Sequence, residues 1–119
     1  MYKRQDLTSP RDLRNLVKRT VDTFGGIDIL VNNGGGPPAG SALEIDDEAL
    51  EQALTLLLFS AVRLTNLCLP HLRTSKAGRI INITSVAVRE PIENLALSNA
   101  IRPGPVSYTH LTLPTIYSV

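Results

Sequence analysis

The sequence has little cysteine, little histidine and almost no net charge, and these shortages exclude several classes of protein. Its 119 residues include one cysteine, two histidines and no tryptophan, and the formal net charge is +1. A single cysteine cannot form an internal disulfide or a cysteine zinc cluster, a pattern typical of reducing compartments. The near-neutral charge offers no basic surface to nucleic acid or to an anionic membrane. We therefore expect a cytoplasmic protein with no metal site and no nucleic-acid partner.

Long apolar runs are also absent. The longest, Leu54–Val62, is broken by Ser60 and stops at Arg63, so it is shorter than the roughly 20 residues that a membrane-spanning helix needs. The N-terminus does not show the basic start and apolar core of a signal peptide. We therefore expect no membrane partner. The remaining composition, with 43% hydrophobic and 19% charged residues, is typical of a globular domain.

The two ends of the chain are related through their possible coding sequences. One coding of MYKRQ (residues 1–5), with GTG as start codon, is the reverse complement of a stretch within a coding of PVSYTH (residues 105–110). The shared string resembles a transposon end used to prepare sequencing libraries, and LTLPT resembles the adapter that continues from it. The alternative is a coincidence of codon choice in two genuine segments. We interpret residues 1–5 and 105–119 as extraneous translated adapter sequence, to be excluded from fold reasoning.

Hydrophobic periodicity in the remaining residues, 6–104, predicts alternating helices and strands. Ser9 is a favourable N-cap, Pro10 suits the first helical position and Gly25 is a typical stop signal. Strands of aliphatic residues without clean alternation suit a parallel sheet that is buried on both faces. The expected elements are a helix from Pro10 to Phe24, a strand Ile27–Val31, a helix from Asp46 or Asp47 to about Leu72 with a possible break near Ser60, a strand Arg79–Thr84, and a helix within Glu93–Arg102.

This order predicts an α/β fold with a parallel sheet, because strands joined through helices form right-handed crossovers. Ligands of such folds bind beyond the carboxyl ends of the strands. The first strand is followed there by a polar and glycine-rich loop, and the second strand ends at Ser85. The loop glycines allow a backbone to approach a flat ligand, and the asparagine amides can tie neighbouring strands or loops together, although a simple flexible turn would look the same. The loop residues are Asn32, Asn33, Gly34, Gly35 and Gly36.

Three further residues have a spacing that suggests chemistry. Ser85 can donate a hydrogen bond to a carbonyl oxygen, or it can simply cap the strand. Ser98 and Arg102 are four positions apart, so they share a helix face. A cation one turn from a hydroxyl lowers the proton affinity of that hydroxyl. The alternative for this pair is a solvated helix surface.

Taken together, these motifs resemble the short-chain dehydrogenase/reductase family. In that family a serine is followed, after twelve intervening residues, by Tyr-x-x-x-Lys, and Ser85, Ser98 and Arg102 have the same spacing. The stretch IDILVNNGGG resembles the strand that ends in Asn-Asn-Ala-Gly, and LPHL with GRIINITS resembles the next helix and strand. DLTSPRDL resembles the segment whose aspartate lies beside the adenine of the cofactor. The resemblance extends over about residues 6–102.

The resemblance implies a partial Rossmann-type doubly wound parallel sheet, of which residues 6–104 are the central part and the N-terminal phosphate-binding unit is missing. It implies NAD or NADP as cofactor, which the fragment alone would not bind tightly. Its catalytic positions correspond to Ser85, Ser98 and Arg102, and its cofactor-binding positions to Asp6, Leu7, Asn32, Asn33, Gly34 and Gly35.

The departures from the family pattern lie at the catalytic positions. Ser98 replaces the tyrosine, and an aliphatic alcohol is a far weaker acid than a phenol. Arg102 replaces the lysine and keeps the charge with a different geometry. By ungapped counting, Leu57 occupies the position of an asparagine that belongs to the proton relay.

The resemblance thus implies a fragment of an oxidoreductase that interconverts a carbonyl and an alcohol with a non-standard catalytic set. The fragment alone is expected to be inactive. The expected partners are a small-molecule carbonyl or alcohol substrate and, in the full-length protein, further copies of itself. The alternative is a catalytically silent relative that binds a dinucleotide or forms a dimer.

Overall fold

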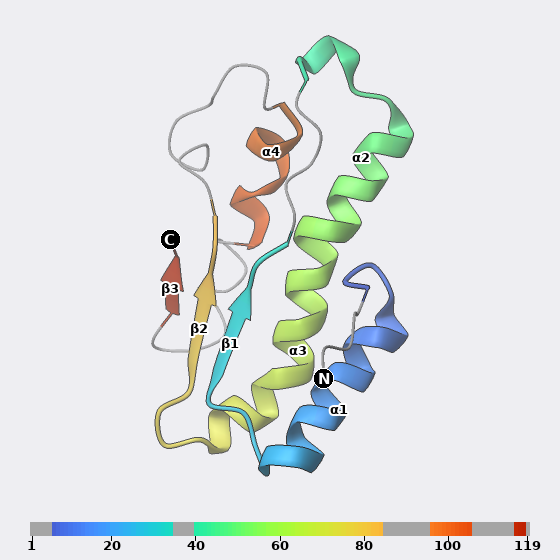
Figure 1. Cartoon of the computed structure of the whole chain (residues 1–119). Coiled ribbons are helices and arrows are strands. Elements are labelled where there is room, and N and C mark those ends of the chain that lie inside the picture. The colour runs from blue at the N-terminus through green and yellow to red at the C-terminus, as the bar shows by residue number, and fades with distance from the viewer. Residues whose placement is uncertain (1–5, 35–39, 85–95, 106–115, 119) are drawn as a thin grey trace.

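The computed structural model describes residues 6–34, 40–84, 96–105 and 116–118. Helices and strands alternate along the chain, and Figure 1 shows the strands side by side with the long helix next to them. The elements are α1 (Pro10–Phe24), β1 (Ile29–Asn32), η1 (Ala42–Glu44), α2 (Asp47–Ala53), η2 (Leu54–Phe59), α3 (Ser60–Thr74), β2 (Arg79–Asn82), α4 (Ala96–Ile101) and β3 (Ile116–Ser118).

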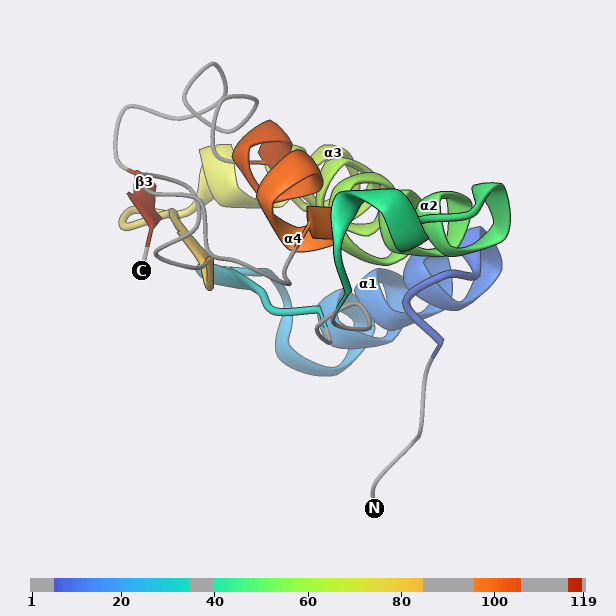
Figure 2. The same ribbon diagram turned by 90° about the horizontal axis from the view of Figure 1, so that it is seen from above.

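The strands form a parallel sheet in the order β1-β2-β3. In the register of β1 and β2, Ile29 lies opposite Arg79 and Asn32 lies opposite Asn82. The carboxyl ends of the two strands therefore meet at one edge of the sheet. Figure 2 shows α2, α3 and α4 on one side of the strands. The α/β fold with a parallel sheet is confirmed.

Both caps predicted for the first helix are present. The Ser9 hydroxyl accepts a hydrogen bond from the Asp12 N–H at 3.3 Å, which satisfies one of the free donors of the first turn. Gly25 ends the helix with φ at 84°, a left-handed conformation that favours glycine, and its N–H donates to the Val21 carbonyl at 2.8 Å. The predicted extent of this helix is therefore confirmed.

The two predicted strands differ from the structure in their bounds. β1 begins at Ile29 rather than Ile27, and β2 ends at Asn82 rather than Thr84. The reason is their overlap, since paired residues run only from Ile29 opposite Arg79 to Asn32 opposite Asn82. The third strand, β3, comes from the tail that was excluded from the sequence-based fold prediction.

The long helix continues through the break predicted near Ser60. The six residues of η2 form a π-helical segment directly before Ser60, so the helix widens locally instead of ending. The Ser60 hydroxyl donates to the Leu56 carbonyl, and the Thr55 hydroxyl donates to the Glu51 carbonyl at 2.9 Å. These bonds give side-chain partners to carbonyls where the helical ladder is altered.

By length and composition alone, the continuous helix Asp47–Thr74 could cross a membrane. Its inward face instead contributes Leu64, Cys68 and Leu72 to a core shared with the sheet. A core helix passes the same length and composition test, so the helix is weak evidence for a membrane span.

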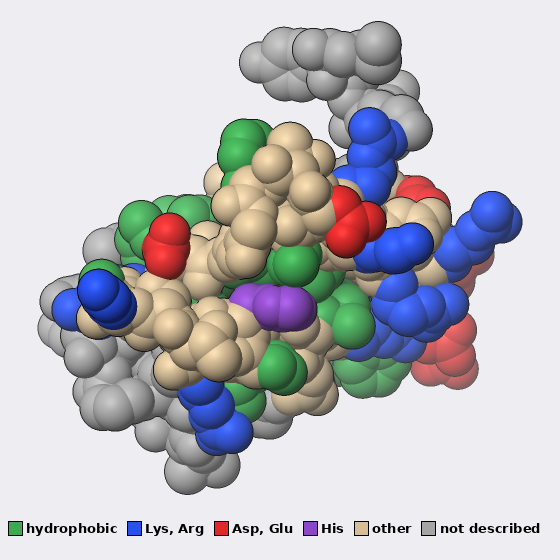
Figure 3. All heavy atoms as spheres, turned by 90° about the horizontal axis from the view of Figure 1, so that it is seen from below, with side chains coloured by type: hydrophobic (Ala, Val, Ile, Leu, Met, Phe, Trp, Pro, Cys, Tyr) green, Lys and Arg blue, Asp and Glu red, His purple; other side chains and the backbone are tan. Residues whose placement is uncertain are grey.

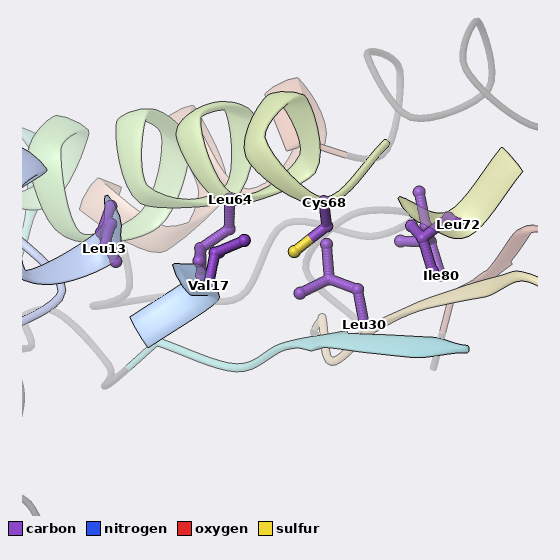
Figure 4. Close-up of a cluster of buried hydrophobic side chains, with 7 residues drawn as sticks. All are labelled: Leu13, Val17, Leu30, Leu64, Cys68, Leu72 and Ile80. Atoms are coloured by element: carbon purple, nitrogen blue, oxygen red, sulfur yellow. The ribbon is translucent and has the colours of Figure 1, made fainter. Parts of the chain in front are cut away.

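The larger core joins α1, α3, β1 and β2. Figure 4 shows Leu30 reaching from β1 toward α3, and Val17 of α1 lying close to Leu64 of α3. Burial raises the pKa of the Cys68 thiol in this core to about 11, because the thiolate is poorly solvated there. The core residues are Leu13, Val17, Leu30, Leu64, Cys68, Leu72 and Ile80.

A second, smaller core connects α4 to the helical segment around η2. It consists of Ala53, Leu57, Leu97 and Ile101, all nearly inaccessible to solvent. This packing holds α4, and with it the helix face that carries Ser98, against the long helix.

Charges of both signs are mixed on the outer surface. On the face drawn in Figure 3, Lys and Arg side chains lie among Asp and Glu, with hydrophobic side chains between them. This mixture agrees with the near-neutral net charge of the chain.

Candidate functional site

The carboxyl ends of β1 and β2 are tied together by a buried amide network. The Asn32 side-chain N–H donates to Asn82 Oδ1 at 3.0 Å and to Thr65 Oγ1 at 3.4 Å. Asn32, Asn82 and Thr65 are all buried. Within the described part of the chain, Asn32 Oδ1 is a buried atom with no hydrogen-bond partner. The network fixes β1, β2 and α3 relative to one another at the edge of the sheet where a ligand is expected.

Asn32 therefore ties neighbouring elements together, which is a role that asparagine amides in this position allow. It was predicted to bind cofactor, whereas its amide N–H groups are used within the fold. Sequence reasoning missed Asn82 and Thr65 as its partners. A usable signal existed for Asn82, because it is a polar residue within the apolar strand RIINIT and matches Asn32 at the end of the other strand.

The loop after β1 passes close to the long helix. A Cβ atom on Gly34 would lie 3.0 Å from the Leu56 carbonyl oxygen, so only a residue without a side chain fits there without a shift. Asn33 is exposed beside it. Gly35 lies outside the described residues. The close approach that requires glycine at position 34 is therefore to the long helix, whereas the sequence predicted an approach to a flat ligand.

Ser98 and Arg102 are in direct contact. Arg102 Nε donates a hydrogen bond to Ser98 Oγ at 2.9 Å, and Arg102 Nη1 lies 3.5 Å from the Ile83 carbonyl oxygen. Ser98 is only 5% exposed. The guanidinium thus connects α4 to the chain just beyond β2. The alternative that this pair lies on a solvated helix surface does not hold, because Ser98 is buried and the Arg102 guanidinium makes hydrogen bonds within the fold.

A cavity of about 230 Å³ lies along β1, between α1 and α3. Arg102, Thr84, Asn33 and Gly34 line its end near the carboxyl ends of the strands, and apolar side chains of α1 and α3 line the remainder. Ser98 is not among the lining residues, whereas Arg102, which donates a hydrogen bond to it, is. The cavity brings three of the predicted site positions, Asn32, Asn33 and Gly34, together with Arg102.

The two predicted adenine-side residues, Asp6 and Leu7, lie just before α1. Leu7 lines the cavity. Asp6 is exposed, and its carboxylate accepts hydrogen bonds from the Thr8 hydroxyl at 2.6 Å and the Thr8 N–H at 2.9 Å. These two bonds, the hydroxyl first, lower the pKa of Asp6 below its usual value.

Two further positions predicted from the family pattern are Leu57 and Ser85. Leu57 is buried and packs in the smaller core with Leu97 and Ile101 of α4, so it supplies no polar atom to a relay. Ser85 lies outside the described residues. Among the residues that the structure describes, no three His, Cys, Asp or Glu side chains are grouped as a metal site would require.

Parallel strands joined through helices, with polar residues gathered at their carboxyl ends, define a nucleotide-binding type of α/β domain. A family model described as short chain dehydrogenase matches residues 1–112. The chain belongs to the short-chain dehydrogenase family.

Curated relatives resemble this chain over part of their length. Mouse L-fucose dehydrogenase is 44% identical over 82 residues, which are 68% of this chain and 30% of that protein. A putative ketoacyl reductase of the monensin polyketide synthase from Streptomyces virginiae is 32% identical over 106 residues, 87% of this chain and 41% of that protein. The chain thus spans less than half of these relatives.

Solved structures agree on the fold. A short-chain dehydrogenase from Streptomyces avermitilis matches with a TM-score of 0.88 and 21% identity, over 98% of this chain and 45% of that one. An NADPH-bound short chain oxidoreductase from Pseudomonas aeruginosa PAO1, described as containing an atypical catalytic center, matches with a TM-score of 0.82 and 26% identity. That match covers 87% of this chain and 40% of the other.

Proposed function

We propose that this chain is the central part of an NAD(P)-dependent oxidoreductase that interconverts a carbonyl and an alcohol, with Ser98 and Arg102 in place of a tyrosine and a lysine. The observation that carries the proposal is the 2.9 Å hydrogen bond from Arg102 Nε to the buried Ser98 hydroxyl. The guanidinium that holds this buried hydroxyl lines the cavity at the carboxyl end of the parallel sheet, where ligands of this fold bind, and we propose that a bound substrate reaches the polarised hydroxyl beside it.

The contact determines what Ser98 can do. Because Arg102 donates to the serine oxygen, the hydroxyl hydrogen remains available to an acceptor such as a substrate carbonyl oxygen or a water. The adjacent positive charge makes that hydrogen a stronger donor than in a free alcohol. Ser98 is still a weaker acid than a phenol, so we assign it hydrogen-bond stabilisation of the developing oxyanion, with the proton arriving from water.

The residues at this edge of the sheet fit part of a nicotinamide dinucleotide. Gly34 brings the backbone after β1 within contact of the helix at Leu56, so no side chain obstructs that end of the cavity. Arg102 lines the same end and carries donors suited to ribose hydroxyls. When bound, the cofactor supplies or accepts the hydride. The glycine-rich turn that binds the pyrophosphate has no counterpart in this sequence, so we expect weak cofactor binding by these residues alone.

A restoration experiment in the full-length protein tests the proposal. The double variant Ser98→Tyr, Arg102→Lys rebuilds the common pair, and the bulky phenol must displace packing around α4, where Ser98 is buried. We expect carbonyl reduction with NADPH or NADH to fall in the double variant, because the native site is built around the serine and the arginine. The assay is loss of nicotinamide absorbance, with circular dichroism to verify folding.

The opposite outcome supports the alternative that the protein is a catalytically silent member of the family. If the native full-length protein binds cofactor without turnover and the double variant gains activity, the chain is a dinucleotide-binding or dimer-forming protein whose catalytic pair was lost. The buried Leu57 at the relay position is the observation that favours this second candidate. For either function we propose a cytoplasmic location, a small-molecule ligand and assembly of the full-length protein with further copies of itself.

A further inference from the structure

The cavity between α1 and α3 combines one cation with apolar walls. Among the lining residues that the structure describes, Arg102 is the one that carries a charge, since none is Asp, Glu, His or Lys. Cys68 also lines the cavity, but burial raises the pKa of its thiol to about 11, so the thiol is uncharged near neutral pH. The guanidinium therefore meets no compensating carboxylate in the described lining.

Arg102 has hydrogen-bond donors left for a ligand. Its Nε donates to Ser98 and its Nη1 lies 3.5 Å from the Ile83 carbonyl oxygen, and within the described part of the chain its Nη2 makes no hydrogen bond. A carboxylate accepts guanidinium donors in pairs, and more strongly than a neutral oxygen does. An anionic head group therefore complements this end of the cavity.

The rest of the cavity is apolar in effect. Two hydroxyl groups line it, those of Thr20 and Ser60. Each donates to a carbonyl of its own helix, Thr20 to Leu16 at 2.8 Å and Ser60 to Leu56, so neither hydrogen is free for a ligand. The aliphatic side chains of the lining come from α1, β1 and α3 and include Leu16, Val17, Leu30, Ala61 and Leu64.

The volume of the cavity indicates how long an apolar chain it can take. An apolar cavity of about 150 Å³ holds benzene, which has six carbon atoms. The cavity described above is about 230 Å³, so in proportion it holds roughly nine non-hydrogen atoms. A straight-chain carboxylate with seven carbons and two oxygens has that size.

We propose that this cavity binds an aliphatic monocarboxylate of about six to eight carbons, with its carboxylate on the Arg102 guanidinium and its chain between α1 and α3. The guanidinium favours an anion over a neutral or cationic ligand, and the apolar walls favour a chain without polar groups. The proposal concerns binding alone and does not depend on the oxidoreductase activity.

Titration of the 119-residue chain with heptanoate, followed by two-dimensional NMR, tests the proposal. We expect the Arg102 Nε–H and the Val17 and Leu30 amides to shift with one dissociation constant. Affinity should increase about 4-fold for each methylene from butyrate to heptanoate, because each is buried between α1 and α3. 1-Heptanol has the same chain without the charge and should bind about 10-fold more weakly or worse.

Arg102→Gln removes the charge and keeps an amide donor. It should weaken heptanoate binding by about 10-fold or more, because the carboxylate loses its charged partner. Arg63→Gln is the matched control, since Arg63 lies over the Phe59 ring, 5.4 Å from its centroid, and does not line the cavity. It should leave the affinity within about 2-fold of the native value, as expected for a surface change.

Four results overturn the proposal. The first is no shift at Val17 and Leu30 up to about 10 mM heptanoate. The second is equal affinity for heptanoate and 1-heptanol, which would show that the charge is not recognised. The third is an equal effect of the two arginine variants. The fourth is a set of shifts confined to Phe59 and Val62, which would place the ligand in a second apolar hollow on the long helix. If Arg102→Gln changes the spectrum throughout the chain, the ligand series on the native chain decides by the same criteria.

Discussion

Replacing Gly78 by alanine is expected to destabilise the fold by about 3 kcal/mol or more, within the range of severe backbone clashes. Gly78 lies in the turn between α3 and β2. A Cβ atom there would lie 3.0 Å from the Leu72 carbonyl carbon and closer still to the carbonyl oxygen. Neither atom can move easily, because Leu72 is 1% exposed in the core and its carbonyl also accepts the Ser75 N–H at 3.2 Å. The measurement is the midpoint of urea unfolding.

Gly26→Ala is the matched control. Gly26 also lies in a turn between a helix and a strand, but a Cβ atom on it would meet nothing within 4 Å. We expect a change in unfolding free energy within about 0.5 kcal/mol for this surface substitution. Equal destabilisation by the two alanines would contradict the packing described for the turn before β2.

Ser98→Ala in the full-length protein is expected to lower kcat for carbonyl reduction by about 10²-fold or more, the usual cost of removing one donor to an oxyanion. The change deletes the hydroxyl that Arg102 holds and leaves the rest of α4 in place. Because the proposed hydrogen bond strengthens in the transition state, kcat and kcat/KM should fall together. Steady-state kinetics with NADPH and NADH measure both.

The control for this variant is Ser75→Ala. Ser75 follows α3 at the amino ends of the strands, away from the site, where its hydroxyl donates to the Asp28 carboxylate. It should leave kcat within about 2-fold of the native value, as expected for a surface change. A Ser98→Ala enzyme with native kcat would remove Ser98 from the catalytic set and leave water or another residue as donor.

The alternation of elements could be predicted from local signals. Ser9, Pro10 and Gly25 marked both ends of α1, because capping depends on neighbouring residues alone. The bounds of β1 and β2 could not be predicted from local signals. They depend on which residues of the two strands pair, and the paired residues Asn32 and Asn82 are 50 positions apart in the sequence. The π-helical segment η2 could not be predicted either, because a π-helical turn within an apolar run has no distinct sequence pattern.

The sequence predicted which types of residue lie at the site better than it predicted the contacts between them. The spacing of Ser98 and Arg102 predicted a shared helix face; α4 ends at Ile101, directly before Arg102, and the structure shows that the two side chains are joined by a hydrogen bond, with Ser98 buried. For Asn32, the sequence offered a polar residue at a strand end and no means of finding Thr65, which lies on another element. Long-range partners of this kind arise from packing, which a single sequence does not display.

Turnover by the full-length native protein is the most direct test of the central claim that Ser98 and Arg102 form a working site. The measurement is oxidation of NADPH and NADH, followed by absorbance, across a panel of ketones, aldehydes and keto sugars, with cofactor binding determined in parallel. The account predicts turnover of at least one carbonyl class that depends on both substrate and enzyme. Tight cofactor binding without turnover of any member of the panel would contradict it and leave the silent, dinucleotide-binding reading in its place.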